Sequence, residues 1–168
     1  MTIGVFTACS SPGKEDIDSP VAEETVDGPK ESYTEYGITI YEDSVSFIDG
    51  RGQEVTIKKN PERTVILYNS FLDLWVLNGG NVIGKLEPSE DQEEIPGLED
   101  VEVIGKLGTI SAEKVISVEP DLIFLNASLP SQMELIPVFE ESNIQVVALE
   151  YVGLDDYLKN VRLFTAIN

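Results

Sequence analysis

The chain has 168 residues, which is enough for one domain with a hydrophobic core, and no apolar stretch is long enough to span a bilayer. Its 31 acidic and 11 basic residues give a formal charge of -20, which disfavours nucleic acids and anionic lipid surfaces as partners because both are themselves negative. The sequence contains no histidine, which excludes Ser-His-Asp and Cys-His catalysis and every His-ligated metal site.

The N-terminal segment ends at Cys9, the sole cysteine, which has no partner for an internal disulfide. Small residues before a cysteine, after an apolar stretch, are typical of a signal-peptide cleavage site. Phe6-Thr7-Ala8-Cys9 resembles the bacterial lipobox, in which the cysteine is acylated, although Phe6 replaces the usual leucine. We interpret residues 1–9 as the remnant of a lipoprotein signal with acylated Cys9. The alternative is an ordinary N-terminus with a chance cysteine.

Residues 10–40 are rich in Ser, Pro, Glu, Asp and Gly and poor in apolar side chains. Such a segment cannot bury enough surface to offset the entropy that is lost on ordering. We predict a disordered acidic tether here, which is what a surface lipoprotein anchored through Cys9 needs. The folded lobe is expected to span residues 41–168.

Two alternating runs open this lobe, residues 45–48 and 53–57, and Asp49-Gly50-Arg51-Gly52 separates them. Alternation of apolar and polar residues on both sides of an Asp-Gly turn is typical of a β-hairpin. We therefore predict an N-terminal hairpin ahead of the rest of the lobe.

After Pro61 the pattern changes to short apolar runs that alternate with segments of helical period. Asn78-Gly79-Gly80 is typical of a glycine C-cap, and Pro120 ends a second helix. Strands that alternate with helices at this spacing predict an α/β fold with a doubly wound, mainly parallel sheet. The predicted strands are 64–68, 82–84, 101–104, 121–125 and 145–149, and the predicted helices are 70–79, 111–118, 131–142 and 153–165.

Four stretches, taken in order, resemble one protein family. They are residues 49–57, 61–67, 72–84 and 105–123. The last is the most specific, because a glycine loop, a Ser-capped helix with Glu113 and a Pro-Asp strand start follow in the family's order. Together they resemble the substrate-binding proteins of ABC importers for iron–siderophore, haem and cobalamin ligands.

The resemblance implies a non-enzymatic receptor of the class III periplasmic-binding-protein fold, in which two α/β lobes flank a ligand cleft and are joined by one long helix. Such a receptor holds no permanent cofactor and delivers a ferric siderophore, haem or cobalamin to an ABC permease dimer. On this resemblance residues 41–168 are the N-terminal lobe, the second lobe is absent, and the protein is extracytoplasmic and lipid-anchored to the cell membrane. The alternative is a truncated single lobe that does not transport.

Ligands of open parallel sheets bind at the carboxyl ends of the strands, where the loops converge. Aromatic and amide side chains at such an edge suit a large, partly apolar chelate, and the ammonium group of Lys106 suits an anionic siderophore. No direct metal ligands are predicted. The candidate ligand-binding residues are Tyr68, Asn69, Ser70, Lys106, Thr109, Asn126 and Tyr151.

Four of these candidates also have a structural alternative, and Ser111 is expected to cap its helix as well. Asn69 and Ser70 precede a helix, where N-capping is the common role of such side chains. Tyr68 can simply cover a strand end, and Asn126 can satisfy the backbone groups of a turn.

Glu134 is a separate case. The resemblance implies a glutamate on each lobe that pairs with permease arginines, and Glu134 lies near the matching position. Ser131 and Glu134 also fit the Ser-x-x-Glu capping box. The two roles are compatible, because a first-turn glutamate remains largely exposed.

Two other α/β classes were weighed. Residues 120–126 also resemble the phospho-acceptor strand of bacterial response regulators, but Asn126 at the acceptor position cannot form an acyl phosphate, and Tyr68-Asn69 stands where an acidic pair is expected. A dinucleotide-binding enzyme needs Gly-x-Gly-x-x-Gly after its first strand, and residues 67–71 contain no glycine.

Overall fold

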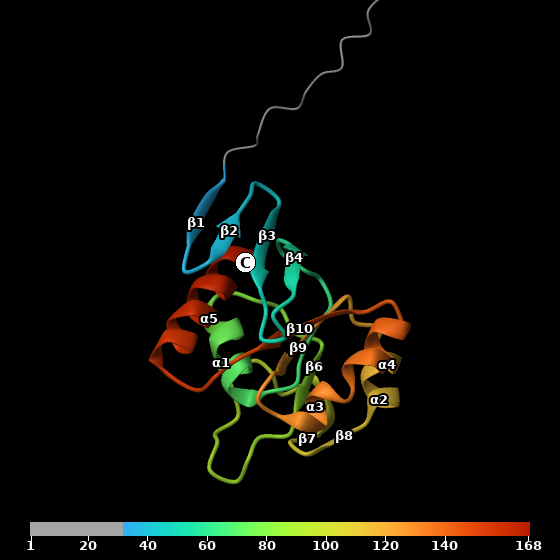
Figure 1. Ribbon diagram of the computed structural model, residues 1–168. Coiled ribbons are helices and arrows are strands. Elements are labelled where there is room, and N and C mark those ends of the chain that lie inside the picture. Colours follow the sequence, from blue (N-terminus) through green and yellow to red (C-terminus); the bar gives the residue numbers. More distant parts are fainter. Residues whose placement is uncertain (1–31) are drawn as a thin grey trace, which may run out of the picture.

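The computed structural model describes residues 32–168, which form two sheets and five helices (Figure 1). The smaller sheet is antiparallel, with its four strands in chain order. These strands are β1 (Tyr33–Glu35), β2 (Ile38–Ile40), β3 (Ser44–Ile48) and β4 (Glu54–Lys58). The predicted hairpin of residues 45–57 is confirmed as β3 and β4.

Residues 33–40 were expected to belong to the disordered tether, and that expectation is wrong. They form β1 and β2, and β2 pairs with β3. The reason is that Ile38 and Ile40 alternate with Thr39, so that one face of β2 adds two buried side chains to the core. The remainder of the predicted tether and the predicted acylation at Cys9 lie outside the described residues.

The larger sheet contains six strands in the order β10-β9-β5-β6-β7-β8. Neighbouring strands are parallel except for β7 and β8, which confirms the mainly parallel sheet. Two strands lie further toward the C-terminus than predicted: the predicted strand 82–84 is β6 (Gly84–Leu86), and the predicted strand 101–104 is β7 (Glu102–Lys106). The strands are β5 (Thr64–Ile66), β6 (Gly84–Leu86), β7 (Glu102–Lys106), β8 (Thr109–Ile110), β9 (Leu122–Asn126) and β10 (Gln145–Leu149).

Helices cover both faces of this sheet, as a doubly wound fold requires. On one face lie α1 (Asn69–Leu77) and α5 (Leu154–Ile167), together with the smaller sheet. On the other face lie α2 (Ala112–Ser117), α3 (Pro130–Met133) and α4 (Ile136–Glu141). All five residues of β9 are buried, because this strand lies between two parallel neighbours and has a helical layer on each side.

The predicted helix 131–142 is two short helices instead of one. Pro137 explains the break, because it has no N–H to donate to the carbonyl four residues earlier and its ring clashes with that turn. In the structure Pro137 lies in the first turn of α4, where a free N–H would have no intrahelical acceptor.

The predicted glycine C-cap of α1 is confirmed. Gly79 has a φ of 85°, and the Gly80 N–H donates to the Trp75 carbonyl at 2.9 Å. Gly80 also lies directly against the indole, since a Cβ at this position would be 2.2 Å from the Trp75 ring. The cap therefore fixes both the end of α1 and the position of the Trp75 side chain.

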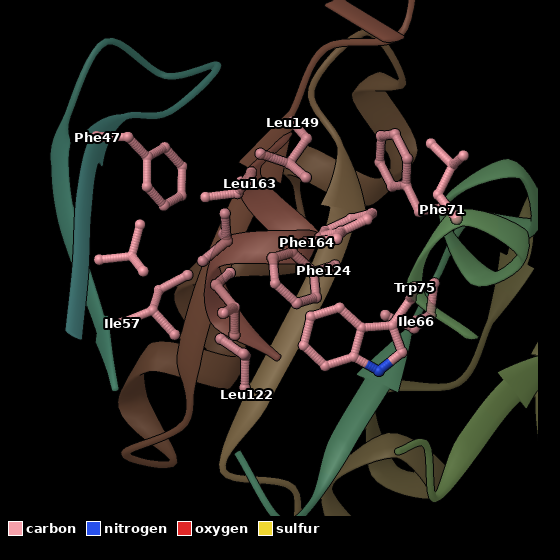
Figure 2. Packing of buried hydrophobic residues seen from close by; sticks show 14 of the residues in the cluster. Phe47, Ile57, Ile66, Phe71, Trp75, Leu122, Phe124, Leu149, Leu163 and Phe164 are labelled. Carbon is pink, nitrogen blue, oxygen red and sulfur yellow. The ribbon is translucent and has the colours of Figure 1, made fainter. Parts of the chain in front are cut away.

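The larger core cluster joins both sheets through aromatic side chains (Figure 2). The Phe164 ring of α5 is 5.3 Å from the Trp75 ring and 5.1 Å from the Phe124 ring, measured between centroids. Phe47 and Ile57 of the hairpin point into the same layer (Figure 2). Burial of these large apolar surfaces is the main favourable term that attaches the hairpin sheet to the lobe.

A partly buried ion network ties the hairpin turn to the opposite layer. Arg51 donates to Asp49 Oδ2 and to Glu140 Oε1, both at 2.7 Å, and to the Val146 carbonyl at 3.0 Å. The Asp49 side chain is 0% exposed and also accepts two turn N–H groups. Burial alone would lower the pKa of Arg51, but the hydrogen bonds and charges of Glu140 and Asp49 raise it above its ordinary value.

We expect Arg51→Leu to lower the free energy of unfolding by about 3 kcal/mol, because it leaves the Asp49 carboxylate buried without its cation. Urea unfolding followed by far-UV circular dichroism measures this change. Lys58→Leu is the control, since Lys58 is an exposed cation at the end of β4, and its loss should change stability by less than about 0.5 kcal/mol. Equal effects of the two substitutions would contradict a stabilising role for the network.

Candidate functional site

The carboxyl ends of β5, β6, β7, β9 and β10 all lie at one edge of the larger sheet, because these strands are parallel. The chain order reverses between β5 and β9, which makes their junction the topological switch point. The predicted ligand-binding residues follow four of these strands, so the fold brings their backbone positions to a common edge.

The crevice at the switch point is filled by Gln132 of α3, a residue that sequence reasoning missed. Its side chain is fully buried, with Oε1 accepting from the Asn126 N–H at 2.7 Å and Nε2 donating to the Leu67 carbonyl at 2.5 Å. Asn126 is buried too, and its Oδ1 accepts from the Ser128 N–H at 2.8 Å. The turn role of Asn126 is therefore what the structure supports, and we leave Asn126 out of the proposed ligand contacts.

A pocket of about 540 Å³ opens beside the switch point, over the ends of β5, β6 and β7, and we call it the edge pocket. Four of the seven predicted ligand-binding residues line it. Its volume lies in the range of small-molecule sites. The lining residues are Tyr68, Asn69, Ser70, Glu87, Pro88, Ser89, Glu90, Gln92, Lys106 and Leu107.

Asn69 shapes the edge pocket by holding its outer loop. It is the first residue of α1, the N-cap position is taken by Tyr68, and the Asn69 amide donates to the loop instead, so the capping alternative is wrong for Asn69. Its Nδ2 donates to Gln92 Oε1 at 2.8 Å and to the Glu87 carbonyl at 3.2 Å. Ser89 Oγ donates to the same Gln92 oxygen at 2.7 Å. One amide thus fixes the loop of residues 87–92 against the start of α1.

Lys106 is 69% exposed at the end of β7, and its Nζ lies 3.0 Å from Glu87 Oε2. The ammonium group expected to attract an anionic siderophore therefore already has a carboxylate partner inside the edge pocket. Thr109 lies across the β7–β8 turn, is exposed, and lines neither the edge pocket nor the pocket of about 270 Å³ between α1 and the loop of residues 87–98.

Three tyrosines gather at the same sheet edge. The Tyr68 and Tyr151 rings are 5.9 Å apart, and Tyr151 is 6.4 Å from Tyr157 of α5, in edge-on arrangements. Burial raises the pKa of Tyr151, as do Tyr157, Tyr68 and Asp73, while a hydrogen bond with Ser70 acts in the opposite direction. Tyr157 was not predicted, because its place at the edge depends on how the first turn of α5 packs.

A second pocket, of about 270 Å³, lies between α1 and the loop of residues 87–98, and we call it the loop pocket. It shares Asn69, Pro88 and Gln92 with the edge pocket. Lys85 of β6 lies at its base, only 2% exposed, and donates to Glu94 Oε1 at 2.7 Å and to the Leu98 carbonyl at 2.5 Å. The sequence offered no sign of this lysine, since most lysines are exposed.

Glu134 is exposed, as expected, but the predicted capping box is wrong. α3 begins earlier than expected, after Leu129, so Ser131 lies inside the helix and Glu134 is its C-cap residue. By contrast, the predicted Ser111 cap of α2 is confirmed, with its side chain accepting from the Lys114 N–H at 3.3 Å.

Within residues 32–168, no cluster of three or more His, Cys, Asp or Glu side chains is arranged to hold a metal ion. None of the helices in this part of the chain has the length and apolar character needed to cross a bilayer.

Solved structures with the same architecture are found by structural comparison. SirA of Staphylococcus aureus, solved with staphyloferrin B, gives a TM-score of 0.58 at 18% identity over 72% of this chain and 41% of SirA. The petrobactin-binding protein YclQ of Bacillus subtilis gives 0.59 at 17% identity over 75% of this chain and 45% of YclQ. An ABC transporter substrate-binding protein of Listeria monocytogenes EGD-e gives 0.55 at 15% identity over 64% of this chain and 40% of that protein.

No protein-family model matches the chain, and a search of curated proteins finds no match. The chain spans between 40% and 45% of the length of the three proteins above, which fits one lobe of a two-lobe molecule. At these identities the likeness is one of fold. The chain has the fold of one lobe of the ABC-transporter substrate-binding proteins, the class III periplasmic-binding-protein architecture that the sequence resemblance implies.

Proposed function

We propose that this chain is a ligand-binding lobe of the extracytoplasmic substrate-binding component of an ABC importer, anchored to the cell membrane through acylated Cys9. It captures a ferric siderophore or a related metal chelate such as haem or cobalamin, and it delivers this ligand to a permease dimer. The ligand enters with its metal already chelated, and the protein holds no permanent cofactor.

The edge pocket is the observation that carries this proposal. It lies at the carboxyl ends of parallel strands, beside the switch point, where open α/β sheets bind their ligands. It combines an aromatic ring from Tyr68 with amide and hydroxyl groups from Asn69, Ser70 and Gln92. A chelate with an apolar rim and several carbonyl or hydroxyl oxygens needs this mixture of contacts.

Three of the structural neighbours support the same ligand class. SirA is described in complex with staphyloferrin B, YclQ as a petrobactin-binding protein, and a third neighbour, HmuT, as a haem-binding protein. Each covers a comparable share of this chain, 72% to 75%. Since the likeness is one of fold, the ligand of this chain must be established by binding.

Tyr68→Ser is expected to weaken chelate binding about tenfold, because it removes the aromatic wall of the edge pocket. Isothermal titration calorimetry of the 168-residue chain with ferric siderophores, haem and cobalamin measures the affinity directly. Intrinsic tryptophan fluorescence is a poorer reporter, since Trp75 is fully buried in the core.

Tyr36→Ser is the matched control, because Tyr36 is an exposed tyrosine in the β1–β2 turn of the smaller sheet and lines none of the described pockets. It should leave the affinity unchanged. If no chelate binds the parent chain, or if the two substitutions have the same effect, the edge pocket is not the site of a chelate receptor.

The proposed permease contact is Glu134. Glu134→Arg should weaken binding of the chain to its permease dimer in nanodiscs at least tenfold, since it places like charges opposite the expected permease arginines. Surface plasmon resonance measures this affinity. Glu141→Arg, at the exposed end of α4, makes the same charge change elsewhere on this layer and should have a much smaller effect. Equal loss in both variants would remove Glu134 as a specific contact.

A further inference from the structure

We propose that the edge pocket selects metal chelates that carry a positive charge or none and discriminates against anionic ones. This inference rests on the proposed chelate-binding function and specifies its ligand class. It reverses the expectation that Lys106 would attract an anionic siderophore.

Both cations that line the two connected pockets are already compensated. Lys106 lies 3.0 Å from Glu87, and Lys85 lies 2.7 Å from Glu94 and also donates to the Leu98 carbonyl. An anionic ligand would have to compete with these carboxylates for the ammonium groups. The Lys106–Glu87 pair is exposed and contributes little energy by itself, but Glu87 already neutralises the ammonium group, so an anionic ligand gains little from Lys106.

Carboxylates of the same pockets remain without a cationic partner. Within residues 32–168, Glu90 of the edge pocket and Asp73, Asp91 and Glu93 of the loop pocket take part in no ion pair. The pockets therefore present a surplus of negative charge, and the formal charge of -20 on the whole chain adds to the local potential.

Asp73 and the nearby tyrosines add to the attraction of this negative charge for cations. Asp73 lines the loop pocket and is exposed to solvent, and partial desolvation raises the pKa of its carboxyl above the ordinary value. Asp73 is also close enough to Tyr151 to raise the pKa of that phenol. Tyr68 lines the edge pocket together with Glu90, so a ligand ammonium group in this pocket would meet an aromatic ring and a carboxylate, a combination that attracts cations.

The test holds the chelate constant and changes only its charge. The probes are the gallium(III) complexes of one linear trihydroxamate whose terminal amine is free, acetylated or succinylated, which carry charges of about +1, 0 and −1 by the chemistry of these groups. Titrations of the ¹⁵N-labelled 168-residue chain, followed through its amide signals, detect binding even at millimolar dissociation constants.

We expect the cationic complex to bind most tightly and the anionic complex least, with a ratio on the order of tenfold at low salt that shrinks as salt screens the carboxylates. Glu90→Gln and Asp73→Asn should each reduce this ratio. Glu141→Gln, which changes the total charge equally at a distance from both pockets, should leave the ratio nearly unchanged.

The outcomes separate this inference from the proposed function. If none of the three complexes binds, the chelate-binding function fails and the inference fails with it. If all three bind equally, or if the anionic complex binds best, the function stands and the charge selection is overturned. Equal reduction of the ratio by Glu90→Gln, Asp73→Asn and Glu141→Gln would also overturn it, because total charge would then explain the preference.

Discussion

Burial of the central strands on both faces is the constraint on which the rest of this molecule depends. β5 and β9 are buried along their whole length, so each needs a layer of apolar side chains above and below. α1, α5 and the hairpin sheet supply one layer, and the three short helices supply the other. Helices connect most of the parallel strands, whereas the loop of residues 87–101 connects β6 to β7, and the loops with the candidate side chains emerge at the carboxyl edge.

This arrangement explains why the site lies beside the switch point and not in it. Gln132 occupies the crevice between β5 and β9 and satisfies the backbone groups of both neighbouring segments. The free space is therefore displaced toward β6 and β7, where the loop of residues 87–98 forms the outer wall. Asn69 holds this acidic loop in place, and we propose that the charge of the loop determines which ligands the edge accepts.

Local sequence patterns predicted the parts of the fold that are determined by interactions between residues close in sequence. The hairpin, the glycine C-cap of α1 and the Ser111 cap of α2 depend on neighbouring residues, and each is confirmed. It was also predictable which residues lie at the carboxyl edge of the sheet. Four of these, Tyr68, Asn69, Ser70 and Lys106, line one pocket. β1 and β2 were missed because three-residue strands give almost no periodic signal, and they gain their order from pairing with β3.

The features that sequence reasoning missed depend on contacts between distant segments. Nothing local distinguishes the buried Lys85 from an exposed lysine, because its partners Glu94 and Leu98 reach it only after the loop folds back. The same is true of Gln132, whose acceptor on Leu67 is 65 residues away in sequence. The net charge of the site could therefore be determined only from the structure, which places each cation beside its carboxylate.

The central claim is that a chelate binds at the carboxyl edge of the larger sheet. The most direct test is paramagnetic broadening of the amide signals of the ¹⁵N-labelled chain by a ferric trihydroxamate, since high-spin iron broadens only nearby nuclei. We expect broadening confined to the amide signals of residues 68–70, 87, 89–92 and 106–107. Broadening centred on residues 60–62 and 121, at the amino ends of the strands, or spread evenly over the surface, would contradict it.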